Sequence, residues 1–209
     1  DVNLDLFKDF DRRWRAGSIS FKPYPCCRHT HSAIDAALEI RRQLSELKGD
    51  SIKSLTVHTY GTALSIAGKV KPKSSREAKF SISYCVAASI LFGTPGEATF
   101  ENFDKPELKA LLERITVIDD PEIDACVPNN WPCRIEAVTE SGKELAAQIR
   151  APKGDPENEV SWEGCEMKFR TMTLDILTPA QADAVIAYVK NFENIADFSR
   201  ENLFRIANS

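Results

Sequence analysis

The sequence switches several times between helical and strand periodicity, which restricts the fold to classes that combine helices with a sheet. Apolar residues spaced by three and four predict a helix over residues 32–47. An alternating pattern predicts a strand over residues 51–60 directly after it. We expect one face of this strand to carry Leu55, Val57 and Thr59, and the other face to carry Thr56, His58 and Tyr60.

The remaining segments continue this pattern. A hairpin is predicted around the turn Glu140-Ser141-Gly142, with strands over residues 134–139 and 143–150. Another strand is predicted over residues 115–119, and residues 61–78 are predicted to be a long connection rich in lysine. Further helices are predicted over residues 4–15, 80–92, 106–114 and 198–207, and one more begins at Thr178-Pro179.

We therefore expect an α+β protein with a small mixed or antiparallel sheet, packed with helices and flanked by terminal helices. The expected organisation is a helical segment over residues 1–20, an α+β domain over residues 21–170 and C-terminal helices over residues 171–209. The length of 209 residues is enough to bury a core. A composition of 43% hydrophobic and 28% charged residues excludes a disordered chain.

Charge and hydropathy exclude two classes of partner. The chain has 27 basic and 31 acidic residues, so it lacks the basic surplus of a general nucleic-acid binder. It has no run of roughly 20 apolar residues, so we expect no membrane span and a soluble protein. The six cysteines include no Cys-x-x-Cys pair, which favours reduced thiols in the cytoplasm. Because residue 1 is Asp rather than Met, we expect the chain to be part of something larger.

Residues 22–31 form the densest polar cluster and contain two of the three histidines. A helix N-terminus disfavours an imidazolium and favours bound anions, so His31 is a candidate general base beside amides that suit a carboxylate. The alternative is that His31 caps the helix or fills a pocket. We expect His29 to be solvated or structural.

Lys22 lies between Phe21 and Pro23 in a segment whose prolines prevent a helix. It is a candidate cation for a substrate carboxylate, or a base if burial lowers its pKa. The alternative is a solvated surface lysine.

The adjacent Cys26 and Cys27, with His29 and His31, match no structural zinc spacing, so we expect no metal site. Cys27 is either a nucleophile or a small buried residue. The basic stretch over residues 69–79 either gathers an anionic substrate or is a solvated loop. Tyr84 either supplies a phenolic donor or packs in the core.

Several segments together resemble the MmgE/PrpD family, which includes 2-methylcitrate dehydratase, cis-aconitate decarboxylase and iminodisuccinate epimerase. The block Lys22-Pro-Tyr-Pro-Cys, followed by His31 and Ile34-Asp35-Ala36, is similar to the family's Lys-x-Tyr-Pro block with its later His and Asp-Ala helix. Three further blocks are similar to later family blocks in the same order: Ala78-Lys79-Phe80-Ser81-x-x-Tyr84, Gly154-Asp155-Pro156-Glu157-Asn158 and Lys168-Phe169. The resemblance covers residues 21–170.

This resemblance implies that the chain is the second half of a longer protein. Family members have a helical domain first and a smaller α+β domain after it, and their last helices return to the helical domain. The active site lies in the cleft between the domains. The resemblance therefore implies an N-terminal helical domain or subunit as partner, a homodimer, and no metal or organic cofactor.

The activity implied is that of a cofactor-independent lyase of small di- or tricarboxylic acids, with dehydration of a 2-methylcitrate-like substrate as the leading case. Lys22, His31 and Tyr84 are the catalytic candidates, and Cys27, Arg28 and Lys79 the substrate-binding candidates. Cys27 stands where the itaconate-forming decarboxylases carry a His, which argues against decarboxylation.

Three alternatives remain. The first is an epimerase, isomerase or decarboxylase of the same family, since an epimerase or isomerase begins with the same proton abstraction. The second is a non-catalytic fragment or subunit that needs a helical partner. The third is a cysteine-based redox or metal-binding module.

Overall fold

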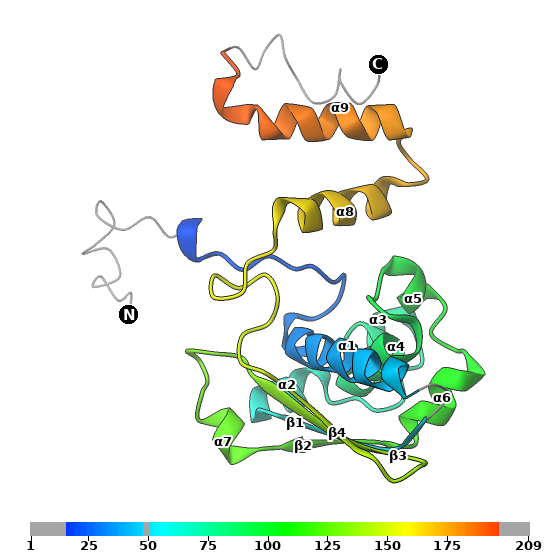
Figure 1. Ribbon diagram of the computed structural model, residues 1–209. Coiled ribbons are helices and arrows are strands. Elements are labelled where there is room, and N and C mark those ends of the chain that lie inside the picture. The colour runs from blue at the N-terminus through cyan, green and yellow to red at the C-terminus, as the bar shows by residue number, and fades with distance from the viewer. Residues whose placement is uncertain (1–15, 48–50, 197–209) are drawn as a thin grey trace. The chain divides into compact units, whose positions relative to one another are not determined.

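The computed structural model describes residues 16–47 and 51–196 (Figure 1). The predicted helices over residues 4–15 and 198–207 lie outside the described residues. The chain divides into two compact units between Val160 and Ser161. This division precedes a helix at Trp162–Thr173, whereas the sequence placed a boundary after residue 170.

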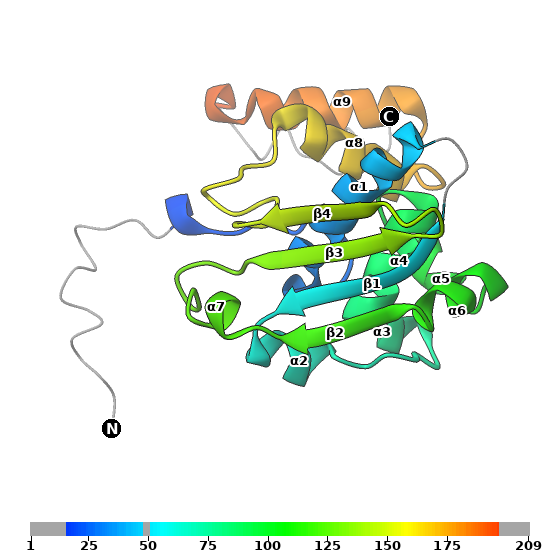
Figure 2. The same cartoon turned by 60° about the horizontal axis from the view of Figure 1, so that its bottom comes forward.

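The first unit is built on a four-stranded mixed sheet (Figure 2). In spatial order its strands are β2 (Ile115–Asp119), β1 (Ile52–Thr59), β3 (Cys133–Thr139) and β4 (Glu144–Ile149). β1 pairs in parallel with β2 and antiparallel with β3, and β3 and β4 form an antiparallel hairpin. The α+β class and the mixed sheet are as predicted.

The helices of this unit lie before and between the strands along the chain. They are η2 (Ala16–Ser18), η3 (Arg28–Thr30), α1 (His31–Glu46), α2 (Gly61–Ala67), α3 (Ser75–Ala78), α4 (Ile82–Phe92), α5 (Glu97–Glu101), α6 (Pro106–Leu112) and α7 (Pro121–Asp124). Figure 1 shows α1 and α4 on one face of the sheet, where α1 contacts β3 and β4 and α4 contacts β2. The main core lies between this helix pair and the sheet.

α1 packs against α4 and buries several small residues. Ala33, Ala36 and Ala37 are buried on α1, and small residues allow two helices to approach each other. α4 is buried from Ile82 to Ile90, which is typical of a helix enclosed by protein on every side. Ser81 caps α4 by accepting a hydrogen bond from the amide of Tyr84, at 3.1 Å.

The predicted strands are confirmed in position and in the faces they bury. Leu55, Val57 and Thr59 are buried on β1. In the hairpin, Ile135 lies opposite Ala147 and Ala137 lies opposite Leu145. These cross-strand pairs bury one face of the sheet, as the alternation in the sequence predicted.

The long connection predicted over residues 61–78 contains two helices that the sequence analysis did not predict, α2 and α3. Ala63 and Ala67, one helical turn apart, bury one side of α2. Ser74 caps α3 through the amide of Glu77. Tyr60 lies beyond the end of β1 and is buried, so it is not part of the predicted outer face of the strand.

The second unit consists of α8 (Trp162–Thr173), α9 (Pro179–Lys190) and η4 (Phe192–Asn194). The predicted cap at Thr178 is confirmed as a capping box with Gln181. Ion pairs join Arg170 to Asp183 and Glu166 to Lys190, and thus join α8 to α9. No helix in the described part of the chain is long and apolar enough to cross a membrane.

The loop over residues 151–158 is held against the extended segment that precedes α1. The amide of Phe21 donates a hydrogen bond to the carbonyl of Gly154 at 2.8 Å, and Gly154 adopts a φ of +94°. A Cβ atom at Gly154 would lie 2.1 Å from the carbonyl oxygen of Phe21. Only glycine therefore permits both the backbone conformation and this close approach.

We expect Gly154→Ala to lower the free energy of unfolding by about 3 kcal/mol or more, because it combines an unfavourable positive φ with a steric clash. Gly142→Ala is the matched control, since Gly142 has a φ of +86° but has no atom within 4 Å of the added Cβ. The control should lose only about 1 kcal/mol. Urea unfolding of both variants measures these changes. Equal losses of unfolding free energy would show that the close approach to Phe21 adds no steric cost.

Candidate functional site

Arg28 links the segment before α1 to the loop over residues 151–158. Its guanidinium forms an ion pair with Asp155, and the two side chains are 21% and 8% exposed. Nη1 also donates to the carbonyl of Lys153 at 2.9 Å and lies 3.3 Å from that of Phe21. Arg28, predicted to bind substrate, is therefore largely engaged by the protein itself.

The same guanidinium fixes the orientation of His31, which begins α1 as predicted. Nη1 of Arg28 lies 2.9 Å from Nδ1 of His31. Arginine only donates, so Nδ1 accepts and the proton of a neutral His31 is carried by Nε2. His31 is fully buried, and its Nε2 has no hydrogen-bond partner among the described residues. The predicted base thus lies in the interior, in the tautomer that donates through Nε2.

Asp35 on α1 provides a second attachment for the loop. Its carboxylate accepts hydrogen bonds from the hydroxyl of Tyr24 and from the amide of Lys153, the latter at 2.7 Å. Burial raises the pKa of Asp35, although both hydrogen bonds oppose this effect. The two attachments bring residues 20–35 and 151–158 together, although they are far apart in the sequence.

Cys27 and Lys79 meet through their backbones. The amide of Cys27 donates to the carbonyl of Lys79 at 2.9 Å. Burial raises the pKa of the Cys27 thiol, which keeps it protonated and favours a packing role over that of a nucleophile. The side chain of Lys79 forms an ion pair with Glu97 at 2.6 Å and lies over the ring of Phe100.

Tyr84 is enclosed in the core. Its hydroxyl donates to the carbonyl of Thr99 at 2.5 Å, its ring packs against Phe100, and burial raises its pKa. Among the described contacts, none joins Tyr84 to Lys22 or His31. The structure therefore does not bring Tyr84 together with the other catalytic candidates.

Lys22 is exposed and lies close enough to His29 to affect its ionisation. Burial and the positive charge of Lys22 both lower the pKa of His29. Nδ1 of His29 lies 2.8 Å from the hydroxyl of Tyr60, and both rings pack against Trp131. The sequence analysis missed Tyr60 and Trp131. Tyr60 follows β1 and Trp131 precedes β3. Because β1 and β3 are antiparallel neighbours, strand order would have placed both residues at the same end of the sheet.

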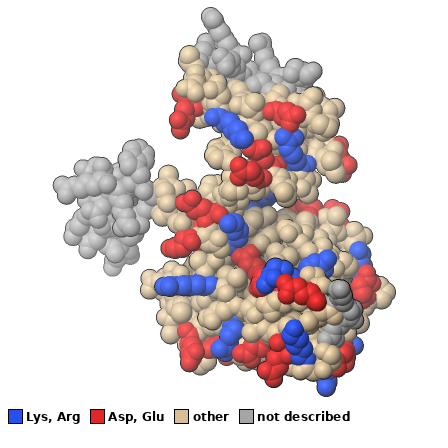
Figure 3. Space-filling view, in the orientation of Figure 1, with Lys and Arg blue, Asp and Glu red and all other residues tan. Residues whose placement is uncertain are grey.

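Three basic residues of the stretch over residues 69–79, Lys69, Lys71 and Lys79, form ion pairs with acidic residues. Lys69 binds Glu77 at 2.5 Å, and Lys71 binds Glu113 at 2.7 Å. On the face shown in Figure 3, basic and acidic side chains are interspersed. This pairing favours the interpretation of a solvated surface over that of an anion-binding loop.

The buried cysteines interact with each other and with polar neighbours. A hydrogen bond with Cys85 is the largest of the interactions that lower the pKa of Cys26, and the pKa of Cys85 is raised by burial. Sγ of Cys26 also lies 3.1 Å from the hydroxyl of Thr30. The described part of the chain contains no group of three or more His, Cys, Asp and Glu side chains arranged to hold a metal ion.

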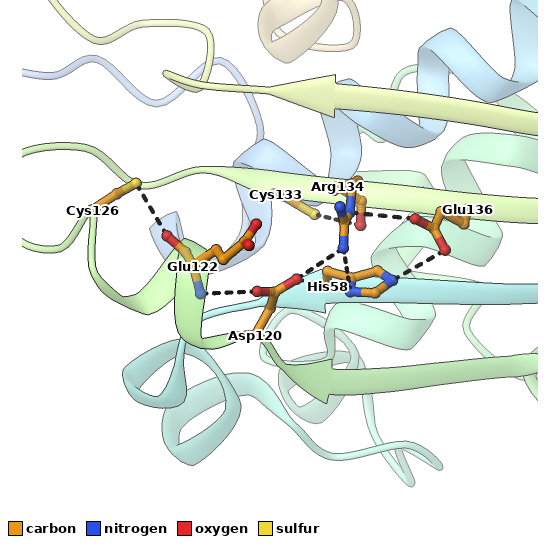
Figure 4. Close-up of polar contacts among 7 residues, drawn as sticks. All are labelled: His58, Asp120, Glu122, Cys126, Cys133, Arg134 and Glu136. Atoms are coloured by element: carbon orange, nitrogen blue, oxygen red, sulfur yellow. Dashed lines mark hydrogen bonds and ion pairs between the residues drawn. The ribbon is translucent and has the colours of Figure 1, made fainter.

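A second polar cluster lies on the other face of the sheet (Figure 4). Nδ1 of His58 lies 3.0 Å from Asp120, and its Nε2 lies 3.5 Å from Glu136. Arg134 lies 3.0 Å from Asp120. Desolvation opposes the ionisation of Asp120, but the amide of Glu122, together with His58 and Arg134, outweighs it and lowers the pKa.

A cavity of about 650 Å³ adjoins this cluster, beside α7 and the hairpin. Its charged lining consists of Asp120, Glu122, Arg134 and Arg150. The two acidic and two basic side chains balance, so the cavity has no excess charge to attract an anion or a cation.

Comparison with known families agrees with this architecture. A family model described as the MmgE/PrpD C-terminal domain matches residues 24–194. The chain belongs to the MmgE/PrpD family. Comparison with curated proteins gave no match. The match begins at Tyr24, so Lys22 precedes it.

In this MmgE/PrpD domain, the segment that carries the first block contacts two of the later blocks that resemble the family. Arg28 and Asp155 join the first block to the loop over residues 154–158. Cys27 and Lys79 join the first block to the segment before α4. The contacts around residues 20–35 are thus made by segments on which the family resemblance rests.

We expect Arg28→Lys to destabilise the MmgE/PrpD domain by about 1–3 kcal/mol, because an ammonium cannot reproduce the planar fork of donors and leaves nearly buried acceptors unpaired. Arg42→Lys is the matched control, because Arg42 pairs with Glu39 and Glu46 on the exposed side of α1. The control should show no measurable loss. Urea unfolding gives both values, and an unaffected Arg28→Lys variant would contradict the linking role of Arg28.

Asp120 should make stability depend on pH. Its pKa is lowered by folding, so its stabilising contribution is present above the unfolded carboxyl pKa of about 4 and is lost as the pH falls through the folded value. We expect Asp120→Asn to be less stable than the wild type at neutral pH and to approach it in acid. Urea unfolding across this range measures the difference. Asp104→Asn, which removes an exposed pair with Lys109, should show a much smaller pH-dependent change.

Proposed function

We propose that this MmgE/PrpD domain is part of a cofactor-independent lyase that acts on small di- or tricarboxylic acids. The leading reaction is water loss from a 2-methylcitrate-like substrate after removal of a proton α to a carboxylate. The observation that supports it most directly is the arrangement before α1, where one segment carries the exposed Lys22, His29 and the Arg28 that pairs with Asp155.

The chemistry requires groups that this arrangement offers. Removal of a proton α to a carboxylate builds negative charge on that group, which a nearby cation stabilises. Lys22 is exposed and is the cation proposed to stabilise that charge. In the Nε2–H tautomer, His31 can donate a hydrogen bond through Nε2, while its Nδ1 lone pair is occupied by Arg28 and is not available to act as a base. Tyr84 has no part in this proposal, because its hydroxyl is bonded within the core.

A helical domain or subunit is the proposed partner, as the family resemblance implies. The second unit exposes several large apolar side chains, which is typical of surfaces that bind protein. They are Trp162, Met167, Met172, Leu174, Ile176 and Phe192. A homodimer is also part of this proposal.

We expect Lys22→Ala to reduce turnover of the complete protein by about 100-fold or more, because the developing carboxylate charge loses its cation. The assay follows proton exchange and water loss by NMR on a panel of citrate-like and succinate-like acids. Lys143→Ala, at an exposed site in the β3–β4 hairpin, is the control and should retain activity. Near-normal turnover in Lys22→Ala would remove Lys22 from the mechanism.

The same assay distinguishes the reactions within the family. Water loss from a methylcitrate supports the dehydratase. Proton exchange without water loss supports an epimerase or isomerase, and release of carbon dioxide supports a decarboxylase. If the complete protein shows none of these reactions, the proposed lyase is wrong.

A further inference from the structure

Three aromatic rings from distant parts of the sequence pack against one another. His29 lies in η3, Tyr60 follows β1 and Trp131 precedes β3. The centroids are 5.7 Å apart for His29 and Tyr60, 5.7 Å for His29 and Trp131, and 5.5 Å for Tyr60 and Trp131. The aromatic cluster formed by these three residues restricts the orientation of the His29 imidazole.

The hydrogen bond between His29 and Tyr60 has a direction. Tyr60 is 2% exposed, and burial raises its pKa, so its hydroxyl keeps its proton. A buried hydroxyl needs an acceptor, and among the described residues the acceptor within reach is Nδ1 of His29 at 2.8 Å. Tyr60 therefore donates and Nδ1 accepts. A neutral imidazole in this arrangement carries its proton on Nε2.

The surroundings keep this imidazole neutral. Burial and the charge of Lys22 both lower the pKa of His29. A second cation beside Lys22 would be repelled, whereas a neutral Nε2–H group remains able to donate a hydrogen bond. This leaves His29 as an oriented neutral donor in the same segment as the exposed cation Lys22.

We propose that Nε2–H of His29 donates a hydrogen bond to a carboxylate oxygen of the substrate, with Lys22 supplying the positive charge and Tyr60 positioning the imidazole. This inference rests on the proposed function, because it names the group that recognises the carboxylate at the same site. It makes His29 a substrate-binding residue and Tyr60 a positioning residue. No proton is transferred in this step.

The tautomer is tested first, in the complete protein labelled at the imidazole nitrogens. NMR correlations between ring nitrogens and ring protons should show His29 with its proton on Nε2 at neutral pH. Tyr60→Phe should shift this signature towards the Nδ1–H form, because the donor to Nδ1 is gone. A wild-type His29 that is protonated on Nδ1, or on both nitrogens, would overturn the proposal.

Binding is tested next, with citrate as the probe and NMR titration as the measurement. His29→Phe keeps an aromatic ring but removes the donor, so citrate should bind about tenfold more weakly. His29→Gln can still donate through its amide and should recover part of the affinity. His58→Gln, which changes a histidine on the other face of the sheet, is the matched control and should bind normally. Thermal unfolding confirms that each variant is folded.

The outcomes separate this inference from the proposed function. If Lys22→Ala weakens citrate binding and His29→Phe does not, the role proposed for His29 is wrong and the carboxylate site proposed at Lys22 is supported. If neither variant alters binding, or the complete protein does not bind citrate, the role proposed for His29 and the proposed carboxylate site are both wrong. If both variants weaken binding and Tyr60→Phe changes the tautomer, the oriented donor is supported.

Discussion

The arrangement of the candidate site depends on the guanidinium of one residue, Arg28. It pairs with Asp155, donates to the carbonyl of Lys153 and holds Nδ1 of His31. These acceptors belong to the loop after β4 and to the first turn of α1. A guanidinium presents five N–H donors in one rigid plane, so one side chain can hold several acceptors at once. Without it, nearly buried acceptors would lose their partners.

Local periodicity was sufficient to predict most of the first unit. α1, β1 and the β3–β4 hairpin match their predictions because each buries one face. The short helices escaped prediction for different reasons. In α2, only Ala63 and Ala67 are buried, and the lysines that follow obscured this weak pattern. α5 and α7 are only four or five residues long, too short to show a helical period.

The candidate site was predictable only where its residues are close in sequence. Residues 22–31 were identified as one polar cluster, and Lys22, Cys27, Arg28 and His31 lie within it. The contribution of Tyr60 to His29 was not predicted, because alternation assigned Tyr60 to the outer face of a strand that ends one residue earlier. The side chains of Lys79 and Tyr84 were selected by residue type, whereas their orientation is set by Glu97 and by the carbonyl of Thr99.

The separation of Tyr60, Trp131 and Gly154 along the chain has a consequence for folding. The parallel pairing of β1 with β2 and the contact of Gly154 with Phe21 both close long loops, which is slow because chain entropy is lost before the contacts form. A partly folded chain can contain α1 and the β3–β4 hairpin and still lack the site. The orientation of the His29 ring therefore depends on long-range contacts with Tyr60 and Trp131 and not on the local elements alone.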